Sequence, residues 1–109
     1  VLKAMEEDDG VKITELRVYG GASANNLLMQ FQTDVLAIPV IRPKILETTA
    51  LGAAYLAGLG VKFWSDIDEL RSQWEPDREY EPQQSEAQMS ALIRKWKAAV
   101  KRSLNWINE

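Results

Sequence analysis

The chain has 109 residues, contains no cysteine and no histidine, and carries a formal net charge of −3 at pH 7. This composition excludes disulfides, thiolate catalysis, zinc sites built from Cys and His, and imidazole acid–base chemistry. The acidic balance argues against nucleic acid as a partner. No apolar run approaches the roughly 20 residues that span a bilayer, and no signal-peptide pattern opens the chain. We therefore expect no membrane partner and a cytoplasmic location.

The first segments predict a helix followed by a strand. Residues 1–9 have the pattern of the end of a helix, and Gly10 is a typical helix stop. No initiator Met and no N-cap residue precede this helix, so we expect a fragment whose upstream part is missing. An imperfect alternation of apolar and polar residues predicts a strand over about 13–19.

Apolar side chains at helical spacing predict a helix from Ala24 to about Leu36, with Asn25 or Ser23 as its cap. We expect one face of this helix to pack and the opposite face to be solvated. The packing face holds Leu27, Leu28, Phe31 and Val35, and the solvated face holds Gln30, Gln32 and Asp34.

A second strand and a helix of small residues follow. The apolar run at 38–41 predicts a strand that either lies at a sheet edge or begins at Pro39, and that pairs in parallel with the first strand. Glu47, Thr48 and Thr49 introduce a predicted helix at 50–58 that is made almost wholly of small and apolar residues. Because small side chains permit close approach, we expect this helix to lie against the sheet or the glycine turn.

The last third of the chain predicts two more helices. Residues 65–70 have the pattern of a short helix capped by Ser65. The proline-containing segment 75–84 predicts a surface connection. Apolar residues in steps of three and four predict an amphipathic terminal helix over 89–107. The alternation of strands and helices indicates the α/β class.

The segment from Leu16 to Gln32 is the strongest candidate site. It predicts a strand, a tight turn at two adjacent glycines, and a helix. Such a turn can present backbone N–H groups and a helix N-terminus to a phosphate if no Cβ blocks the approach, a condition that Gly20 and Gly21 meet. The pattern also fits a sharp turn in which glycine only relieves steric strain. Asn25 fits either a helix cap or a ligand-binding amide.

Other polar and aromatic groups favour structural interpretations. The acidic run at 6–9 is typical of a solvated helix end rather than a cation site. The basic residues of the last helix lie opposite its apolar face, which favours solvent over an anionic partner. The four tryptophans lack a basic surround, which favours packing over a stacking platform. No carboxylate pair has the neighbours of a catalytic acid and base, so we expect no catalytic residue and no metal ligand.

Three blocks of sequence are similar to one known family. They are LRVYGGASANNLLMQFQTDVL at 16–36, ETTALGAAYLAGLGVKFW at 47–64 and WKAAVKRSLNW at 96–106. Together they resemble the C-terminal end of glycerol kinases, sugar and polyol kinases that share an ATPase fold with actin, hexokinase and the large heat-shock chaperones. The second block is the most specific. The resemblance implies that residues 1–109 are the C-terminal portion of the second, RNase H-like or actin-like ATPase domain, with short strands and several helices.

The resemblance also implies a site and a reaction. Gly21, with Gly20 beside it, would approach nucleotide phosphates through the backbone, and Asn25 would lie at the adenine end of the site. The implied reaction is ATP-dependent phosphorylation of glycerol to glycerol 3-phosphate, with Mg²⁺ bridging the phosphates and an aspartate accepting the hydroxyl proton. Because that aspartate and the glycerol pocket would lie upstream, we expect the 109 residues alone to be inactive.

Two positions depart from the family pattern. Tyr19 stands where glycerol kinases usually have Asp before the two glycines, and Ala37 stands where glycine is common. The first departure either weakens nucleotide handling or is accommodated by packing. The open alternatives are a kinase for another polyol or sugar and an inactive α/β module that packs or oligomerises. We expect a homo-oligomer, since a truncated domain exposes apolar surface and sheet edges.

Overall fold

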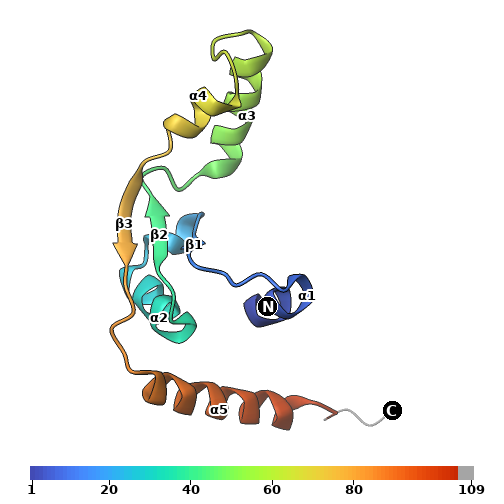
Figure 1. Ribbon diagram of the computed structural model, residues 1–109, viewed down its shortest axis with the longest axis vertical. Helices are drawn as coiled ribbons and strands as arrows, with labels where there is room; N and C mark the ends of the chain where they lie inside the picture. Colours follow the sequence, from blue (N-terminus) through green and yellow to red (C-terminus); the bar gives the residue numbers. More distant parts are fainter. Residues whose placement is uncertain (106–109) are drawn as a thin grey trace.

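The computed structural model describes residues 1–105 as a chain of short elements in an open arrangement (Figure 1). The elements are α1 (Leu2–Asp9), β1 (Leu16–Arg17), the 3₁₀ helix η1 (Gly21–Ala24), α2 (Asn26–Leu36), β2 (Val40–Pro43), α3 (Thr48–Gly60), α4 (Ile67–Ser72), β3 (Pro76–Tyr80) and α5 (Glu86–Ser103). The Cα radius of gyration is 18.6 Å, whereas about 13 Å is expected for a compact domain of this length. The α/β class is confirmed.

The three strands form one sheet in the order β1-β2-β3. β1 and β2 are parallel, with Leu16 opposite Val40, which confirms the predicted pairing. β1 is shorter than predicted, although the N–H of Val18 still donates to the carbonyl of Ile41 at 3.1 Å. The strand at 38–41 was predicted either to lie at a sheet edge or to begin at Pro39. β2 begins directly after Pro39, and it is the central strand of the sheet.

β3 was not predicted, and the expectation of a surface connection over 75–84 is wrong. β3 pairs antiparallel with β2, with Tyr80 opposite Val40 and an irregularity between Arg42 and Pro43. Four of its five residues are exposed, so the segment has the polar composition of a loop. Tyr80, which is 2% exposed, is the residue that joins this strand to the core.

The core is small and lies between α2 and the sheet. Met29, Val40 and Tyr80 form its buried cluster, and Leu16 and Val18 pack against it. This cluster holds α2 against β2 and β3, and the glycine turn directly precedes α2.

The face of α2 that packs is not the predicted one. Asp34 is buried together with Met29 and Thr33, whereas Leu27 is 80% and Phe31 51% exposed. The cause is a polar anchor: the Asp34 carboxylate accepts from the backbone N–H of Gln83 at 2.7 Å and of Gln84 at 3.3 Å, and from the Gln30 amide at 3.0 Å. These bonds, led by that of Gln83, lower the pKa of Asp34.

α3 and α4 stand beyond one end of β2 and β3 (Figure 1). α3 confirms the predicted helix at 50–58 and extends it at both ends. It does not lie against the sheet, because a cleft of about 1000 Å³ separates it from Arg17 of β1 and from Tyr19. Its close approach is made elsewhere, by Gly58 to the ring of Trp64. Asp66, not the predicted Ser65, caps α4 by accepting from the N–H of Glu69.

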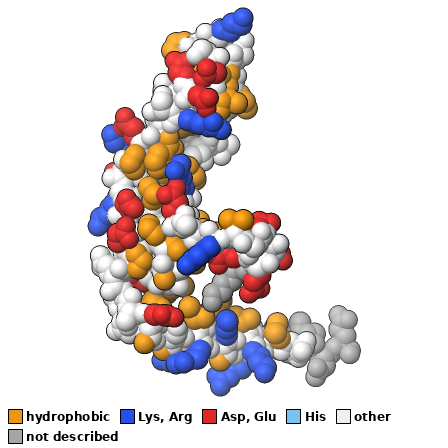
Figure 2. Space-filling model, in the orientation of Figure 1, with side chains coloured by type: hydrophobic (Ala, Val, Ile, Leu, Met, Phe, Trp, Pro, Cys, Tyr) orange, Lys and Arg blue, Asp and Glu red, His pale blue; other side chains and the backbone are white. Residues whose placement is uncertain are grey.

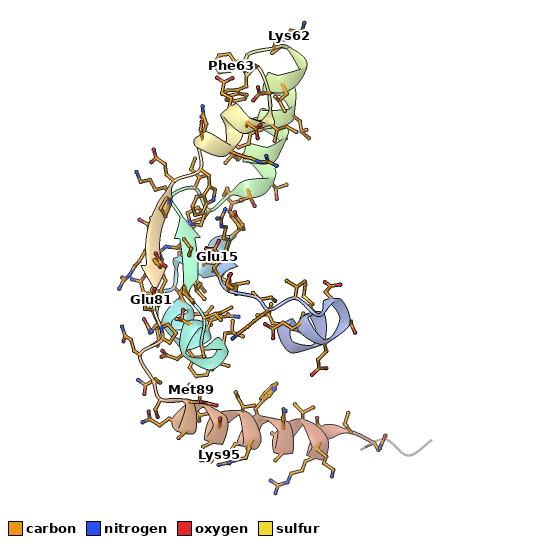
Figure 3. All side chains as sticks on the ribbon, in the orientation of Figure 1. Glu15, Lys62, Phe63, Glu81, Met89 and Lys95 are labelled. Atoms are coloured by element: carbon orange, nitrogen blue, oxygen red, sulfur yellow. The ribbon has the colours of Figure 1, made fainter. Side chains whose placement is uncertain are left out.

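α1 and α5 flank the centre without covering it. α1 ends at Gly10, whose φ of 67° confirms the predicted stop. α5 begins with a capping box of Ser85 and Gln88, and Met89 meets α2 (Figure 3). Farther along the apolar stripe Ile93 is half-buried, whereas Leu92, Trp96 and Val100 are exposed, Trp96 to 70%. Trp106 and Ile107, part of the predicted terminal helix, lie outside the described residues.

Most of the basic side chains of α5 lie along the edge of the helix that faces away from α2 (Figure 2), in line with the predicted solvated face. The basic residues of α5 are Arg94, Lys95, Lys97, Lys101 and Arg102. Over residues 1–105, no helix combines the length and the apolar character needed to cross a bilayer.

Candidate functional site

The glycine turn joins the end of β1 to α2, and its first glycine is required by the backbone. Gly20 has φ 85° and ψ 168°, a combination that is essentially restricted to glycine. Its N–H donates to the carbonyl of Leu46 at 2.9 Å, and its carbonyl accepts from both the N–H and the hydroxyl of Ser23. Gly20 therefore has a conformational role. Ser23 is buried and stabilises the turn through its two hydrogen bonds to Gly20; it does not cap α2.

Gly21 has no such requirement. Its φ is not positive, and a Cβ built on it meets no atom within 4 Å. Within residues 1–105, the N–H groups of Gly21 and Ala22 donate to no protein acceptor. Steric relief of the turn thus explains the first glycine and leaves the second unexplained. A glycine beside two free N–H groups and open space is what a bound anion requires.

The two asparagines after the turn have different roles. Asn25 caps α2, since its Oδ1 accepts from the N–H of Leu28 at 3.1 Å. The amide nitrogen of Asn25 makes no hydrogen bond to any described residue, so it is a free donor. Asn26 is held instead, because its Oδ1 accepts from the Tyr80 hydroxyl at 2.6 Å and from Arg42 at 2.9 Å.

Arg42 connects the turn to the sheet. Its Nη1 lies 3.1 Å from the carbonyl oxygen of Ser23 and 3.4 Å from that of Ala24. Its Nε and Nη2 donate to Oδ2 of Asp77 on β3. The Arg42 side chain is only 13% exposed, and its guanidinium lies 5.7 Å from the centre of the Tyr80 ring.

Tyr19 lines the cleft between β1 and α3, together with Tyr55 and Trp74. It is 45% exposed. Trp74 lies under the Arg17 guanidinium at 4.4 Å, and its indole nitrogen is buried without a partner among the described residues. Trp64 packs edge-on against Tyr55 and Phe63, beyond the end of α3 where Phe63 is labelled in Figure 3. Trp64 and Trp74 thus make packing contacts, as predicted.

The model for the FGGY family of carbohydrate kinases, C-terminal domain, matches residues 1–61. The chain belongs to this family. The match includes the whole glycine turn, α2 and β2, whereas β3, which carries Asp77 and Tyr80, lies outside the matched residues.

Relatives and solved structures extend the comparison over nearly the whole chain. The chain is 58% identical over 106 residues to glycerol kinase of Deinococcus radiodurans and 55% identical over 109 residues to that of Caldanaerobacter subterraneus, covering 97% and 100% of this chain. It spans about a fifth of these relatives, 21% and 22%. The crystal structure of Plasmodium falciparum glycerol kinase with ADP matches 96% of this chain and 21% of its own, with TM-score 0.78 and 31% identity. A ligand-bound xylulose kinase from Lactobacillus acidophilus matches in fold, with TM-score 0.66 and 18% identity over 88% of this chain and 20% of its own.

The residues that hold the FGGY turn in place were missed by the sequence interpretation. Arg42 directly follows the apolar run at 38–41, and Asp77 and Tyr80 lie in the segment that was expected to be a surface connection. The only sequence signal was the isolated aromatic Tyr80 in that polar segment. No group of three or more acidic residues that could hold a metal ion lies within 1–105, and Glu6 of the acidic run accepts instead from the N–H of Ile13.

Proposed function

We propose that this chain supplies the phosphate-binding turn of an ATP-dependent kinase that phosphorylates glycerol. The observation that carries the proposal is Gly21, where open space and free N–H groups accompany a glycine that the backbone does not require. The glycerol kinases that are 55–58% identical to the chain, and the similar structure with ADP, support the nucleotide and the acceptor.

The proposed roles follow from the donors of the turn. The N–H groups of Gly21 and Ala22, with the start of α2 behind them, would donate to phosphate oxygens of the nucleotide. Gly20 would keep the turn in the required shape. Asn25 would use its free amide nitrogen at the adenine end, while its Oδ1 continues to cap the helix.

Phosphoryl transfer depends mainly on positioning and on charge stabilisation, so a rigid phosphate site contributes directly to the rate. In this reaction ATP supplies the phosphoryl group and Mg²⁺ neutralises charge on its phosphates. The described residues offer no acidic cluster for the metal. We propose that the proton-accepting aspartate, the metal ligands and the glycerol pocket belong to parts of a longer kinase of which residues 1–109 are the C-terminal portion, and that the kinase is a cytoplasmic homo-oligomer.

A segment replacement tests the proposal. The matching fifth of the Deinococcus radiodurans glycerol kinase would be exchanged for this chain, and ADP release would be measured with glycerol and with other polyols. We expect glycerol-dependent turnover by the chimera and none by the 109 residues alone. A folded chimera without turnover, or with a preference for another polyol, would contradict the proposal. Light scattering on the same sample reports the oligomeric state.

Tyr19 gives the proposal a second test. In the chimera, Tyr19→Asp restores the residue that glycerol kinases usually have before the two glycines. We expect this variant to lower the KM for ATP if the family residue orders the turn, and to leave it unchanged if Tyr19 is accommodated by the cleft. A higher KM would show that tyrosine is the better residue in this turn.

A further inference from the structure

Arg42 faces the carbonyl end of η1, opposite the end that carries the free N–H groups. Its Nη1 contacts the oxygens of Ser23 and Ala24, the last two residues of η1. In a helical turn the carbonyls and the N–H groups point in opposite directions along the axis. A cation that holds the last carbonyls therefore also sets the direction in which the N–H groups of Gly21 and Ala22 point.

The guanidinium is itself held from three sides. Asp77 accepts from Nε at 2.8 Å and from Nη2 at 2.6 Å, Asn26 accepts from Nη1 at 2.9 Å, and the Tyr80 ring lies beside it. Tyr80 also fixes Asn26 through its hydroxyl. These contacts join the second and third strands to η1 and to the first residue of α2.

The fold does not need Arg42 to join β2 to β3. The two strands are paired along their length, and Lys44 and Glu75 form a separate ion pair between their flanks. That pair is exposed, with both side chains at 62%, whereas the Arg42 side chain is 13% exposed. The difference is that Arg42 reaches beyond the sheet, through Nη1, to the turn.

We propose that Arg42 is a positioning residue for nucleotide binding, which acts by holding η1 so that the donors of Gly21 and Ala22 face the phosphates. This inference rests on the proposed function. Asp77 and Tyr80 support it by keeping the guanidinium and Asn26 in place. The effect falls on the affinity for the nucleotide and not on the acceptor.

The test uses Arg42→Lys in the chimeric kinase, because lysine keeps the charge but has no planar fork that can reach Asp77 and the turn together. We expect a rise of about tenfold in the KM for ATP, which corresponds to about 1.4 kcal/mol, with the KM for glycerol and kcat little changed. Tyr80→Phe, which removes only the hydroxyl on Asn26, should raise the KM for ATP by a smaller factor.

Two acidic substitutions form a matched control. Asp77→Asn and Glu75→Gln each neutralise one carboxylate of an ion pair, that of Asp77 with Arg42 and that of Glu75 with Lys44. Only Asp77 is linked to the turn, through Arg42. We expect Asp77→Asn to raise the KM for ATP and Glu75→Gln to leave it unchanged. Equal effects of the two would overturn the inference, as would a parallel rise in both KM values.

Gly21→Ala separates this inference from the proposed function. If Gly21→Ala raises the KM for ATP and Arg42→Lys does not, the turn binds nucleotide and Arg42 does not position it. If Gly21→Ala has no effect, the proposed phosphate site is itself wrong. Melting temperatures of all variants, compared with the parent chimera, show whether a change in KM reflects general unfolding.

Discussion

Replacing each glycine of the turn by alanine separates a need for an unusual backbone from a need for open space. At Gly20 the substitution has two possible costs. Keeping φ 85° and ψ 168° with a Cβ costs about 1–3 kcal/mol. Relaxing the backbone instead breaks three hydrogen bonds, with Leu46 and twice with Ser23, at about 1 kcal/mol each. The two costs are similar, so we expect Gly20→Ala to destabilise the chain by about 1–3 kcal/mol.

At Gly21 the same substitution should leave the fold intact, because the new Cβ meets nothing within 4 Å. It should weaken nucleotide binding by at least about tenfold, since the methyl group occupies the space through which a phosphate approaches the N–H groups. Urea unfolding of the 109-residue chain, followed by circular dichroism, measures the first effect. Calorimetric titration of the chimera with ADP measures the second. Destabilisation by Gly21→Ala equal to that by Gly20→Ala would refute the reasoning.

Four further predictions concern the rest of the chain. Folding lowers the pKa of Asp34. Its carboxylate therefore contributes to stability above the unfolded pKa of about 4, and this contribution is lost as the pH falls through the folded pKa. Asp34→Asn should reduce the loss of stability to urea at acid pH, and an unchanged pH profile would contradict this. Ala37 ends α2 with φ 55°, so Ala37→Gly should stabilise the chain by about 1 kcal/mol, whereas a loss of stability would show that the cap is not strained. Ser85→Ala removes the capping box of α5 and should cost about 1 kcal/mol, seen as faster hydrogen exchange in the first turn of that helix only. Gly58→Ala places a Cβ 2.1 Å from the Trp64 ring and should therefore shift the tryptophan fluorescence. Gly52→Ala is the control: its Cβ meets nothing within 4 Å, so the fluorescence should stay unchanged.

The local elements of the site could be predicted because each has a local cause. Gly10, Gly20 and Asn25 act through backbone conformation and capping, which depend on neighbours in the sequence. The contacts that hold the turn could not be predicted, since Arg42, Asp77 and Tyr80 meet only when β3 pairs with β2. Four of the five β3 residues are exposed, so this strand lacks the apolar alternation by which strands are found.

The wrong face of α2 has a different cause. Leu27 and Phe31 have helical spacing and apolar side chains, yet they are exposed, while Asp34, which was expected to be solvated, is buried. The chain exposes 8742 Å², where about 6100 Å² is expected for a compact protein of 12.3 kDa. The excess of about 2600 Å² is some three times the surface that one partner buries in a standard interface of about 800 Å² per side.

The sequence predicts that this apolar face of α2 packs, yet the face is exposed in this chain. Such an exposed face is expected of a domain that further polypeptide covers. The FGGY relatives are about five times longer than the region they share with this chain, which spans 21% and 22% of two of them. The apolar spacing on α2 is that of a packed face, although in this structure the buried residues of the helix are Met29, Thr33 and Asp34. The stripe of α5 is exposed in the same way, with Trp96 at 70%, and we expect further polypeptide of a longer kinase to cover both helices.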